Sequence, residues 1–157
     1  MSIRLRGIVL ILTGIAFMSL PAIGSPAGAV SRVREFPIPN PFSDPFGITA
    51  GPDGNLWFTE DEAGRLGIGR LGPGGGTITQ FPLWKDVLTI GITAGPDGNI
   101  WFTAFPHWIC RITVQGVARR FATPTPGSQP PSITPGPNGG LWFTEQFNDR
   151  VGRVAGS

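Results

Sequence analysis

The sequence predicts an all-β fold, a partial β-propeller of about three four-stranded blades. A 14-residue phrase, GITAGPDGNLWFTE, starts at Gly47 and returns with few changes at Gly91 and Ser132, which gives spacings of 44 and 41 residues. Repeats of about 40–50 residues are typical of propellers, in which one four-stranded unit is stacked several times. The Gly-Pro turn inside the phrase recurs in register, and helical periodicity is absent after the N-terminal segment.

Residues 1–29 are expected to be a signal peptide. Arg4 and Arg6 precede an apolar run at 7–20, and an AGA tripeptide ends the segment with a small-residue cleavage site. The alternative is a membrane anchor, for which the apolar run is short, because a helix needs about 20 residues to span a bilayer. We therefore expect a secreted or periplasmic protein whose mature chain, residues 30–157, has no membrane segment.

Each repeat is expected to form four short antiparallel strands, which we denote a to d. In the first repeat a tight turn at 51–54 separates strands a and b, because Pro presets φ and Gly accepts a positive φ. A glycine-rich turn at 72–76 separates strands c and d. The four strands expected in this repeat are 48–50, 55–59, 65–71 and 77–81.

The blades are expected near residues 47–82, 91–122 and 132–155, with one further strand at 33–37 that resembles the d strands. Propellers often close their ring by pairing an N-terminal outer strand with the last blade, but three blades are fewer than the usual four to eight. Three explanations fit. The chain is a truncated copy of a longer gene, it pairs with a second copy as a six-bladed homodimer, or it is a partial array with open edges.

The charge balance and the cysteine content narrow the class of protein. The chain has 12 Lys and Arg against 10 Asp and Glu, and two of the basic residues lie in the expected signal peptide. No basic stripe with interleaved aromatic residues is present, so nucleic-acid binding is not expected. The single cysteine, Cys110, rules out an internal disulfide and is either a reactive thiol or a small apolar residue in a strand.

Propeller geometry predicts which loops carry a binding site. The a–b and c–d turns lie on one face of a propeller, and the b–c and d–a loops lie on the other. The first set is stereotyped here, whereas the second carries unusual residues, and binding usually occurs on the variable loops of a repeated scaffold. We therefore expect the site on the second face, near the central channel. Its loops are 60–62, 83–86, 105–108, 123–131 and 145–149.

Two glutamates are candidate metal ligands. Glu60 and Glu145 directly follow the Trp-Phe-Thr of their repeats, where the second repeat has Ala104. Carboxylates at neighbouring inner strand ends would hold Mg²⁺ through a few oxygens and several waters. The alternative is that each is a loop residue paired with an arginine such as Arg70 or Arg153.

The only histidine, His107, is either a general base or a loop residue that is solvated or stacked on Trp108. Trp84 and Trp108 break the repeat, so both are candidates for stacking against a ligand. The tryptophans that share one repeat position are expected to pack the blades instead: Trp57, Trp101 and Trp142.

The repeat phrase, followed by IGR at 68–70 and ITQFP at 78–82, resembles the virginiamycin B lyase family over residues 33–155. That resemblance implies a seven-bladed propeller that opens the macrocycle of streptogramin B antibiotics by elimination across an ester C–O bond. It also implies Mg²⁺ held by carboxylates and a histidine base. The residues of this chain that could take these roles are Glu60, Glu145 and His107.

Two functions fit these observations. The first is a ligand-binding or scaffold module without a complete catalytic site, whose partner is a small molecule or a cell-surface ligand. The alternative is a Mg²⁺-assisted carbon–oxygen lyase acting on a cyclic ester such as a streptogramin B antibiotic and completed by a second chain. The single histidine, the small number of blades and Cys110, which replaces the Gly of the IGR motif, favour the first function.

Overall fold

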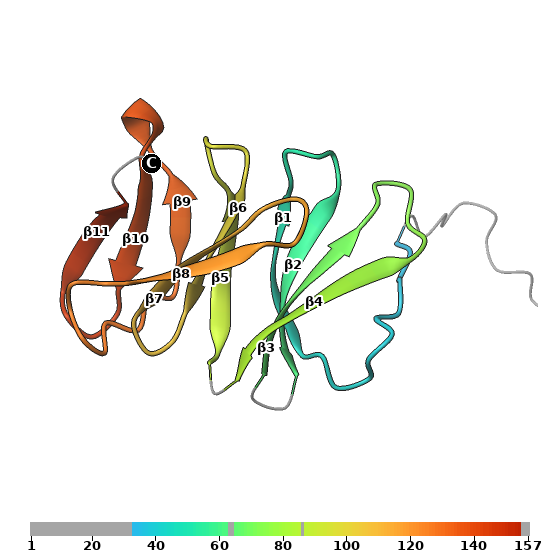
Figure 1. Cartoon of the computed structure of the whole chain (residues 1–157), viewed down its shortest axis with the longest axis horizontal. Helices are drawn as coiled ribbons and strands as arrows, with labels where there is room; N and C mark the ends of the chain where they lie inside the picture. The colour runs from blue at the N-terminus through green and yellow to red at the C-terminus, as the bar shows by residue number, and fades with distance from the viewer. Residues whose placement is uncertain (1–32, 63–64, 86, 155–157) are drawn as a thin grey trace, which may run out of the picture. The chain divides into compact units, whose positions relative to one another are not determined.

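The computed structural model describes residues 33–62, 65–85 and 87–154 and contains three antiparallel sheets (Figure 1). The compact unit formed by residues 35–157 contains all of them. The expected signal peptide at 1–29 lies outside the described residues. Within the described part of the chain, no helix has the length and apolar character needed to cross a membrane.

Each repeat folds into one sheet whose strand order follows the chain. The strands of the first sheet are β1 (Pro45–Ala50), β2 (Leu56–Glu62), β3 (Arg65–Leu71) and β4 (Ile78–Lys85). Those of the second are β5 (Thr89–Ala94), β6 (Ile100–Ala104), β7 (Trp108–Ile112) and β8 (Ala118–Ala122). Those of the third are β9 (Ile133–Pro135), β10 (Leu141–Glu145) and β11 (Arg150–Val154), with a 3-10 turn, η1 (Pro137–Gly139), after β9. The prediction of an all-β fold built from three blade-like sheets is confirmed.

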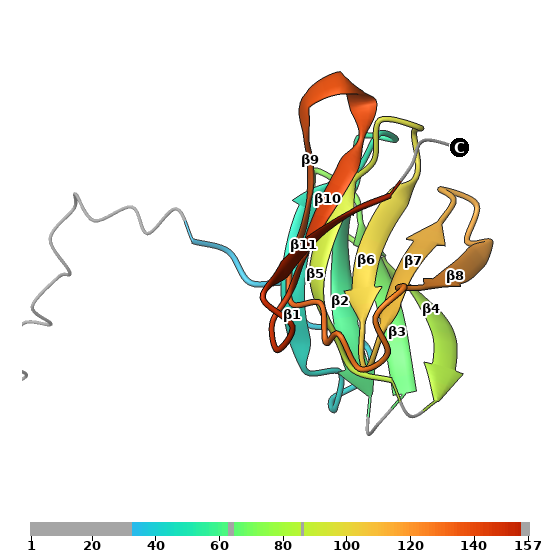
Figure 2. The same cartoon turned by 90° about the vertical axis from the view of Figure 1, so that its left-hand side faces the viewer.

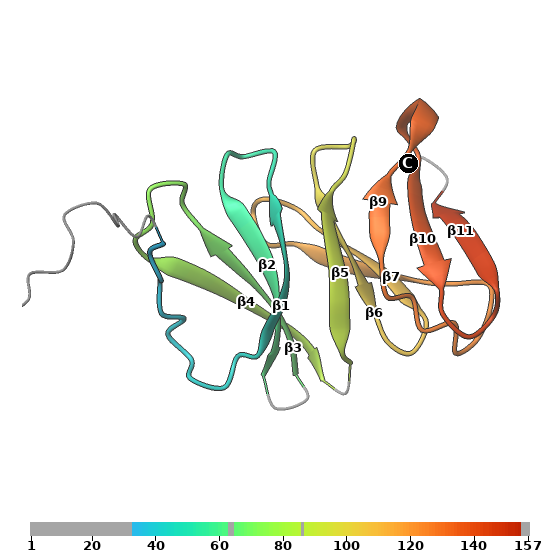
Figure 3. The same cartoon turned by 180° about the vertical axis from the view of Figure 1, so that it is seen from behind.

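The first strands of the sheets are neighbours, because β1 contacts β5 and β5 contacts β9. In Figure 2, β1 and β5 lie on one side of their sheets, and β4 and β8 lie on the other. Figures 1 and 3 place the a–b turns at one end of the sheets and the b–c connections of the second and third blades at the opposite end. The stereotyped turns and the variable loops are therefore separated as the sequence predicts. We call the end that carries the b–c connections the loop face.

Two hydrophobic clusters join the sheets into junctions. In the first junction Trp57, Leu66 and Ile68 pack with Ile100, Phe102, Ala104, Cys110 and Ile112. In the second junction Trp101 and Ile109 pack with Ile133, Leu141 and Phe143. Successive side chains of a strand point to opposite sides. Each blade therefore has a Trp face, which carries the Trp of the phrase, and a Phe face, which carries the Phe. In both junctions the Trp face of one blade meets the Phe face of the next.

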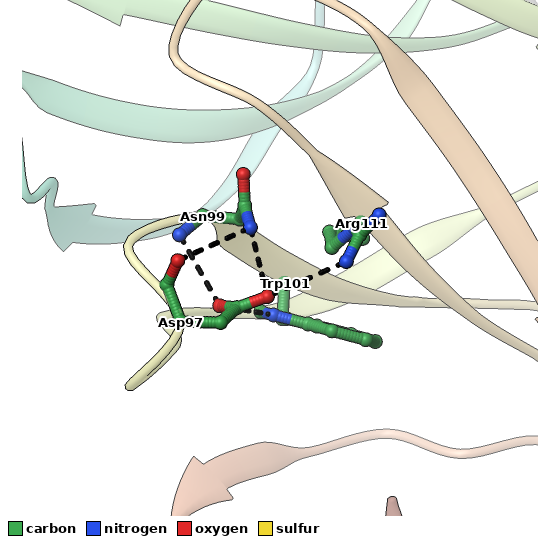
Figure 4. Close-up of polar contacts among 4 residues, drawn as sticks. All are labelled: Asp97, Asn99, Trp101 and Arg111. Carbon is green, nitrogen blue, oxygen red and sulfur yellow. Dashed lines mark hydrogen bonds and ion pairs between the residues drawn. The ribbon is translucent and has the colours of Figure 1, made fainter. Parts of the chain in front are cut away.

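An aspartate in each of the first two a–b turns fixes the tryptophan of the phrase. In the second blade, Trp101 Nε1 donates to Asp97 Oδ1 at 2.9 Å, and Asn99 Nδ2 donates to Asp97 Oδ2 at 2.8 Å (Figure 4). Arg111 adds an ion pair to Asp97 at 3.6 Å. Gly98 completes the turn in the left-handed region, at φ +73°, which favours glycine. We call this arrangement the Asp clamp, and it explains the repeated Asp-Gly-Asn-x-Trp pattern.

The first blade repeats the Asp clamp, but the third does not. Trp57 Nε1 donates to Asp53 Oδ1 at 2.9 Å. The third repeat has Asn138 in place of the aspartate, and this residue adopts φ +61° inside η1. Trp142 Nε1 is buried there without a hydrogen-bond partner among the described residues. The same phrase therefore gives the same strands but a differently stabilised turn.

The strand expected at 33–37 is not formed. A strand requires a backbone ladder with a neighbour, and the neighbour expected for this segment was the edge strand β11 of the third sheet. Phe36 packs instead against Phe58, Leu71 and Ile78 of the first sheet. The segment therefore covers part of the Phe face of the first blade.

Candidate functional site on the loop face

Hydrogen bonds tie two loops together on the loop face of the second blade. Gln129 N donates to the carbonyl of Pro106 at 2.8 Å, and Thr123 N donates to that of His107 at 2.9 Å. The hydroxyls of Thr123 and Ser128, both on buried residues, lie 2.8 Å apart. The long connection at 123–131 is therefore held against the loop that carries the histidine, which makes this part of the face preorganised.

An aromatic–cation ladder lies beside these loops. The guanidinium carbon of Arg120 is 5.5 Å from the ring centroid of Trp84 and 4.6 Å from that of Trp108. The ring of His107 stacks on Trp108, with centroids 4.8 Å apart. The three rings are half-buried, whereas Arg120 is exposed. The ladder joins the outer strand of the first blade to the second blade and leaves a charged side chain open to solvent.

The tryptophans proposed for ligand stacking thus already have a stacking partner. Trp84 belongs to β4 and Trp108 begins β7, so both lie in strands rather than in the loops expected from the sequence. In the register of β7 and β8, Trp108 lies opposite Ala122 and Cys110 lies opposite Arg120. Because residues two apart on a strand point to the same side, Arg120 and Trp108 share one face of the sheet. A ligand at this point would meet the guanidinium and the ring edges together.

Glu60 lies within the first sheet rather than in a loop. The residue is 2% exposed, and its Oε2 accepts a hydrogen bond from Gln80 Nε2 at 2.8 Å. The carboxylate crosses above Gly69, where an added Cβ would lie 2.7 Å from Oε1. Arg70, the partner suggested by the sequence, donates from Nη1 to the carbonyl of Val114 at 2.9 Å.

Glu145 occupies the corresponding position in the third blade. Glu145 is 6% exposed, and its Oε2 is buried without a hydrogen-bond partner among the described residues. The guanidinium carbon of Arg153 lies 5.6 Å from the ring centroid of Trp142, so the expected pairing of Arg153 with Glu145 is not seen. Among the described residues, the third sheet consists of β9, β10 and β11, and none of them supplies an amide to Glu145 as β4 supplies Gln80 to Glu60.

The structure places the two glutamates of the expected Mg²⁺ site in different sheets. They lie on β2 and β10, whereas the inner strands are β1, β5 and β9, and the second sheet stands between them. Across residues 33–62, 65–85 and 87–154, no three His, Cys, Asp or Glu side chains gather as metal ligands would. A Mg²⁺ site held by the two glutamates and waters therefore stays a prediction, and His107 stacks on Trp108.

Cys110 lies in the first junction and is fully buried. Burial raises the pKa of its thiol to about 12, although the nearby charge of Arg120 acts in the opposite direction. A thiol with that pKa is protonated at neutral pH and is a poor nucleophile. The structure therefore supports the interpretation of Cys110 as a small apolar residue.

Sequence reasoning did not identify Arg120 or Gln80. Both occupy one position of strand d, since Gln80 lies opposite Gly69 and Arg120 lies opposite Cys110. Each directly precedes the phenylalanine of its d strand. The d strands can be aligned from the sequence, but the alignment gives no sign that this position meets a buried carboxylate in the first blade and an aromatic ring in the second.

Comparisons with known proteins agree with the fold. The model of the virginiamycin B lyase family matches residues 28–157. A virginiamycin B lyase from Saccharopolyspora erythraea is 50% identical over 95 residues, which cover 60% of this chain and 31% of that protein. A solved virginiamycin B lyase from Staphylococcus aureus is 36% identical with a TM-score of 0.66, covering 77% of this chain and 44% of the other.

A further solved structure holds a ligand. It is a catalytically inactive variant of the S. aureus virginiamycin B lyase with quinupristin, 30% identical with a TM-score of 0.50, covering 76% of this chain and 58% of the other. This chain spans about a third of the S. erythraea relative and under half of the first S. aureus structure. Since the family model matches residues 28–157, which include all the described residues, the chain belongs to the virginiamycin B lyase family.

Proposed function

We propose that this chain is a ligand-binding module of the virginiamycin B lyase family, with its binding site at the aromatic–cation ladder of Trp84, Arg120, Trp108 and His107. The ladder supports this proposal because three half-buried rings and an exposed guanidinium converge on the preorganised part of the loop face. Binding sites commonly combine aromatic surface with a few convergent polar groups.

The ladder suits an amphipathic ligand that carries both aromatic rings and carbonyl groups. Arg120 presents guanidinium N–H donors that suit carbonyl oxygens, and the exposed parts of Trp108 and His107 suit an aromatic ring. Quinupristin accompanies a related S. aureus protein in its solved structure. We therefore take quinupristin as the test ligand for this chain.

The second candidate function is the family's elimination chemistry, which family membership favours. It needs a proton-abstracting base and stabilisation of the negative charge that develops on the substrate. His107 is the available base, and Arg120 is the cation of the ladder. The buried and separated positions of Glu60 and Glu145 argue against a carboxylate-held metal here, so we rank binding above elimination.

Calorimetric titration with quinupristin, with and without Mg²⁺, tests the binding proposal. We expect Arg120→Ala to weaken binding about tenfold or more, because it removes one charged donor from the site. Arg119→Ala is the matched control, since Arg119 is a neighbouring exposed arginine of β8 that lies opposite Arg111 rather than in the ladder. Absence of binding by the unmodified chain, or an equal loss in both variants, would refute the proposal.

Chromatography of the same mixtures separates binding from elimination. We expect intact quinupristin after incubation with the unmodified chain. Linear product that disappears in a His107→Ala variant would instead support elimination and overturn the ranking above.

We also propose that the chain acts outside the cytoplasm. The basic and then apolar N-terminal sequence and its small-residue cleavage site support export. N-terminal sequencing of the protein recovered from its native host tests this, and a start near residue 30 is the expected result. Recovery of the uncleaved N-terminus from the cytoplasm would contradict it.

A further inference from the structure

Three contacts lie at the first junction, between the first two blades. Trp57 stacks on Phe81 of strand d, with ring centroids 5.6 Å apart and planes 12° from parallel. The ring of Phe81 rests against Gly116 in the c–d turn of the second blade. Arg70 Nη1 donates to the carbonyl of Val114 in the same turn at 2.9 Å. A d-strand phenylalanine therefore bridges its own tryptophan and the next blade.

The second junction repeats the stacking. Trp101 stacks on Phe121 of strand β8, with ring centroids 5.7 Å apart. Phe121, Phe143 and Val154 line one hollow, so the d-strand ring again reaches the following blade. Two junctions in one chain thus follow one rule, in which each phrase Trp needs a Phe from strand d.

The N-terminal segment already supplies half of such a junction to the first blade. The ring of Phe36 occupies the space that a Cβ on Gly75 would need, just as Phe81 does at Gly116. Both glycines adopt left-handed backbone angles, φ +83° and φ +93°, in turns closed by a hydrogen bond three residues back. Phe36 therefore contacts the c–d turn of the first blade in the same way that Phe81 contacts the c–d turn of the second blade.

Among the described residues, only the segment around Phe36 and Ile38 packs on the Phe face of the first blade. A groove of about 320 Å³ on this face is lined by apolar residues that include Phe36, Ile38, Phe58 and Leu71. Its rim residues Phe46 and Ile48 are 57% and 64% exposed. In the two junctions of this chain, the corresponding face is covered by the Trp face of a preceding blade.

The Trp face of the third blade is the complementary open surface. Trp142 has Arg153 over its ring, but among the described residues no second aromatic ring stacks on it. Trp142 also lines a hollow of about 150 Å³ with Thr134 and Val151, and Val151 is 66% exposed. In the part of the chain that the structure describes, this blade thus has the tryptophan and the arginine of a junction but no phenylalanine stacked on that tryptophan.

We propose that two copies of this chain associate head to tail, with the Trp face of each third blade against the Phe face of the other copy's first blade. The partner's Phe36 then stacks on Trp142 as Phe81 does on Trp57. Arg153 donates to the carbonyl of the partner's Pro73, which holds the turn position of Val114. A twofold rotation makes the two junctions identical and closes the assembly at six blades, within the four to eight usual for propellers.

The buried carboxylate of Glu145 adds a further prediction about this contact. Gln80 directly precedes Phe81 and donates to Glu60, and Glu35 stands at the same position before Phe36. Glu35 offers an acceptor where the partner's Glu145 needs a donor. A Glu35→Gln substitution supplies that donor and is expected to strengthen dimerisation, since a hydrogen bond to a charged group is favourable.

Sedimentation equilibrium over a series of protein concentrations tests the proposal without using the ladder or its ligand. We expect the mass of a dimer, which Phe36→Ala and Trp142→Ala each weaken about tenfold or more, because each loses one stacked pair at both junctions. Val117→Ala is the control, since Val117 is 62% exposed in the c–d turn of the second blade, away from both open faces. It should leave the mass unchanged.

Mixing the two variants provides the sharper test. A heterodimer of the Phe36→Ala and Trp142→Ala chains keeps one intact junction, so the mixture should dimerise more strongly than either variant alone. If circular dichroism shows that Trp142→Ala does not fold, Val151→Glu replaces it in the test, because this change places a charge on the same face. A monomer at all concentrations, a growing series of larger oligomers, or no rescue on mixing would overturn the proposal.

Discussion

The second and third blades share one phrase but differ in everything that surrounds its tryptophan. Trp101 is 4% exposed, is held by Asp97 and stacks on Phe121. Trp142 is half-buried, follows an asparagine in place of the aspartate, and its indole N–H has no partner among the described residues. Blade 2 packs on both sides, whereas the described neighbours of blade 3 pack only on its Phe face.

The difference shows that the phrase determines where the strands form, whereas residues outside the phrase determine how firmly its tryptophan is held. Both tryptophans pair in the same register with an arginine, Arg111 or Arg153. The aspartate, the d-strand phenylalanine and a following blade determine whether the ring is fixed. We expect blade 2 to be the most stable part of the chain and blade 3 to open more readily.

The largest effect is expected from removing a ring at the centre of blade 2. Phe102 is fully buried in the first junction, so Phe102→Ala leaves a cavity and should lower the free energy of unfolding by about 3–5 kcal/mol. Urea denaturation at fixed protein concentration measures this. A loss under about 1 kcal/mol would mean that the junction collapses around the cavity and is less tightly packed than described.

A smaller effect is expected from exchanging the turn residues of the two blades. Asp97→Asn removes the ion pair with Arg111 and the charged acceptor of Trp101, and should cost about 1–2 kcal/mol. The reciprocal change, Asn138→Asp, offers Trp142 an acceptor and should gain less than about 1 kcal/mol, because Asn138 lies in a 3-10 turn of different shape.

Urea denaturation of both variants and of the double exchange checks the pair. The two changes lie in the a–b turns of different blades and share no hydrogen-bond partner among the described residues, so we expect their effects to add. Equal and small effects in both directions would show that the Asp clamp does not distinguish the blades.

The smallest effect concerns acid. Burial raises the pKa of Asp97, but hydrogen bonds from Asn99 and Trp101 and the charge of Arg111 outweigh this effect, so the pKa is lowered from its ordinary value of 3.8. Burial also raises the pKa of Asp53, but hydrogen bonds from Trp57 and Asn55 outweigh it, so this pKa is lowered too. A carboxyl group with a lowered folded-state pKa stabilises the fold above its unfolded pKa. That stability is lost as the pH falls through the folded pKa.

Thermal unfolding from about pH 6 to about pH 2.5 measures this effect. The Tm of the unmodified chain should fall more steeply below about pH 4 than that of Asp97→Asn, so the two should converge in acid. Parallel curves over the whole range would show that the aspartate contributes no charge-dependent stability.

The sequence predicted the fold well because the phrase contains its own turn and strand chemistry. Gly54 takes φ +77° in the a–b turn, and Trp57 and Phe58 alternate across the sheet, so period and turn can be recognised locally. The site was predicted less well. Glu60 follows the phrase directly, but its burial depends on Gln80, which lies 20 residues further along the chain and two strands away in the sheet.

The aromatic–cation ladder could not be predicted for a similar reason. Trp84 and Trp108 are conspicuous in the sequence, but Arg120, which lies over both rings, comes from a third strand. The two flanking tryptophans belong to different sheets, and their approach depends on how the sheets pack. The alternation of side chains along a strand predicts the two faces of each blade. Contacts between blades can be predicted only when the strand register of both blades is known.

Hydrogen–deuterium exchange at a low and a high protein concentration tests most directly whether the open faces of blades 1 and 3 are halves of one junction. We expect amides in residues 35–38 and in β10 and β11 to become more protected at the high concentration, while those of β6 and β7, already enclosed by two neighbouring blades, change little. Protection that is independent of concentration, or that rises equally in β6 and β7, would contradict the packing rule that links the two faces.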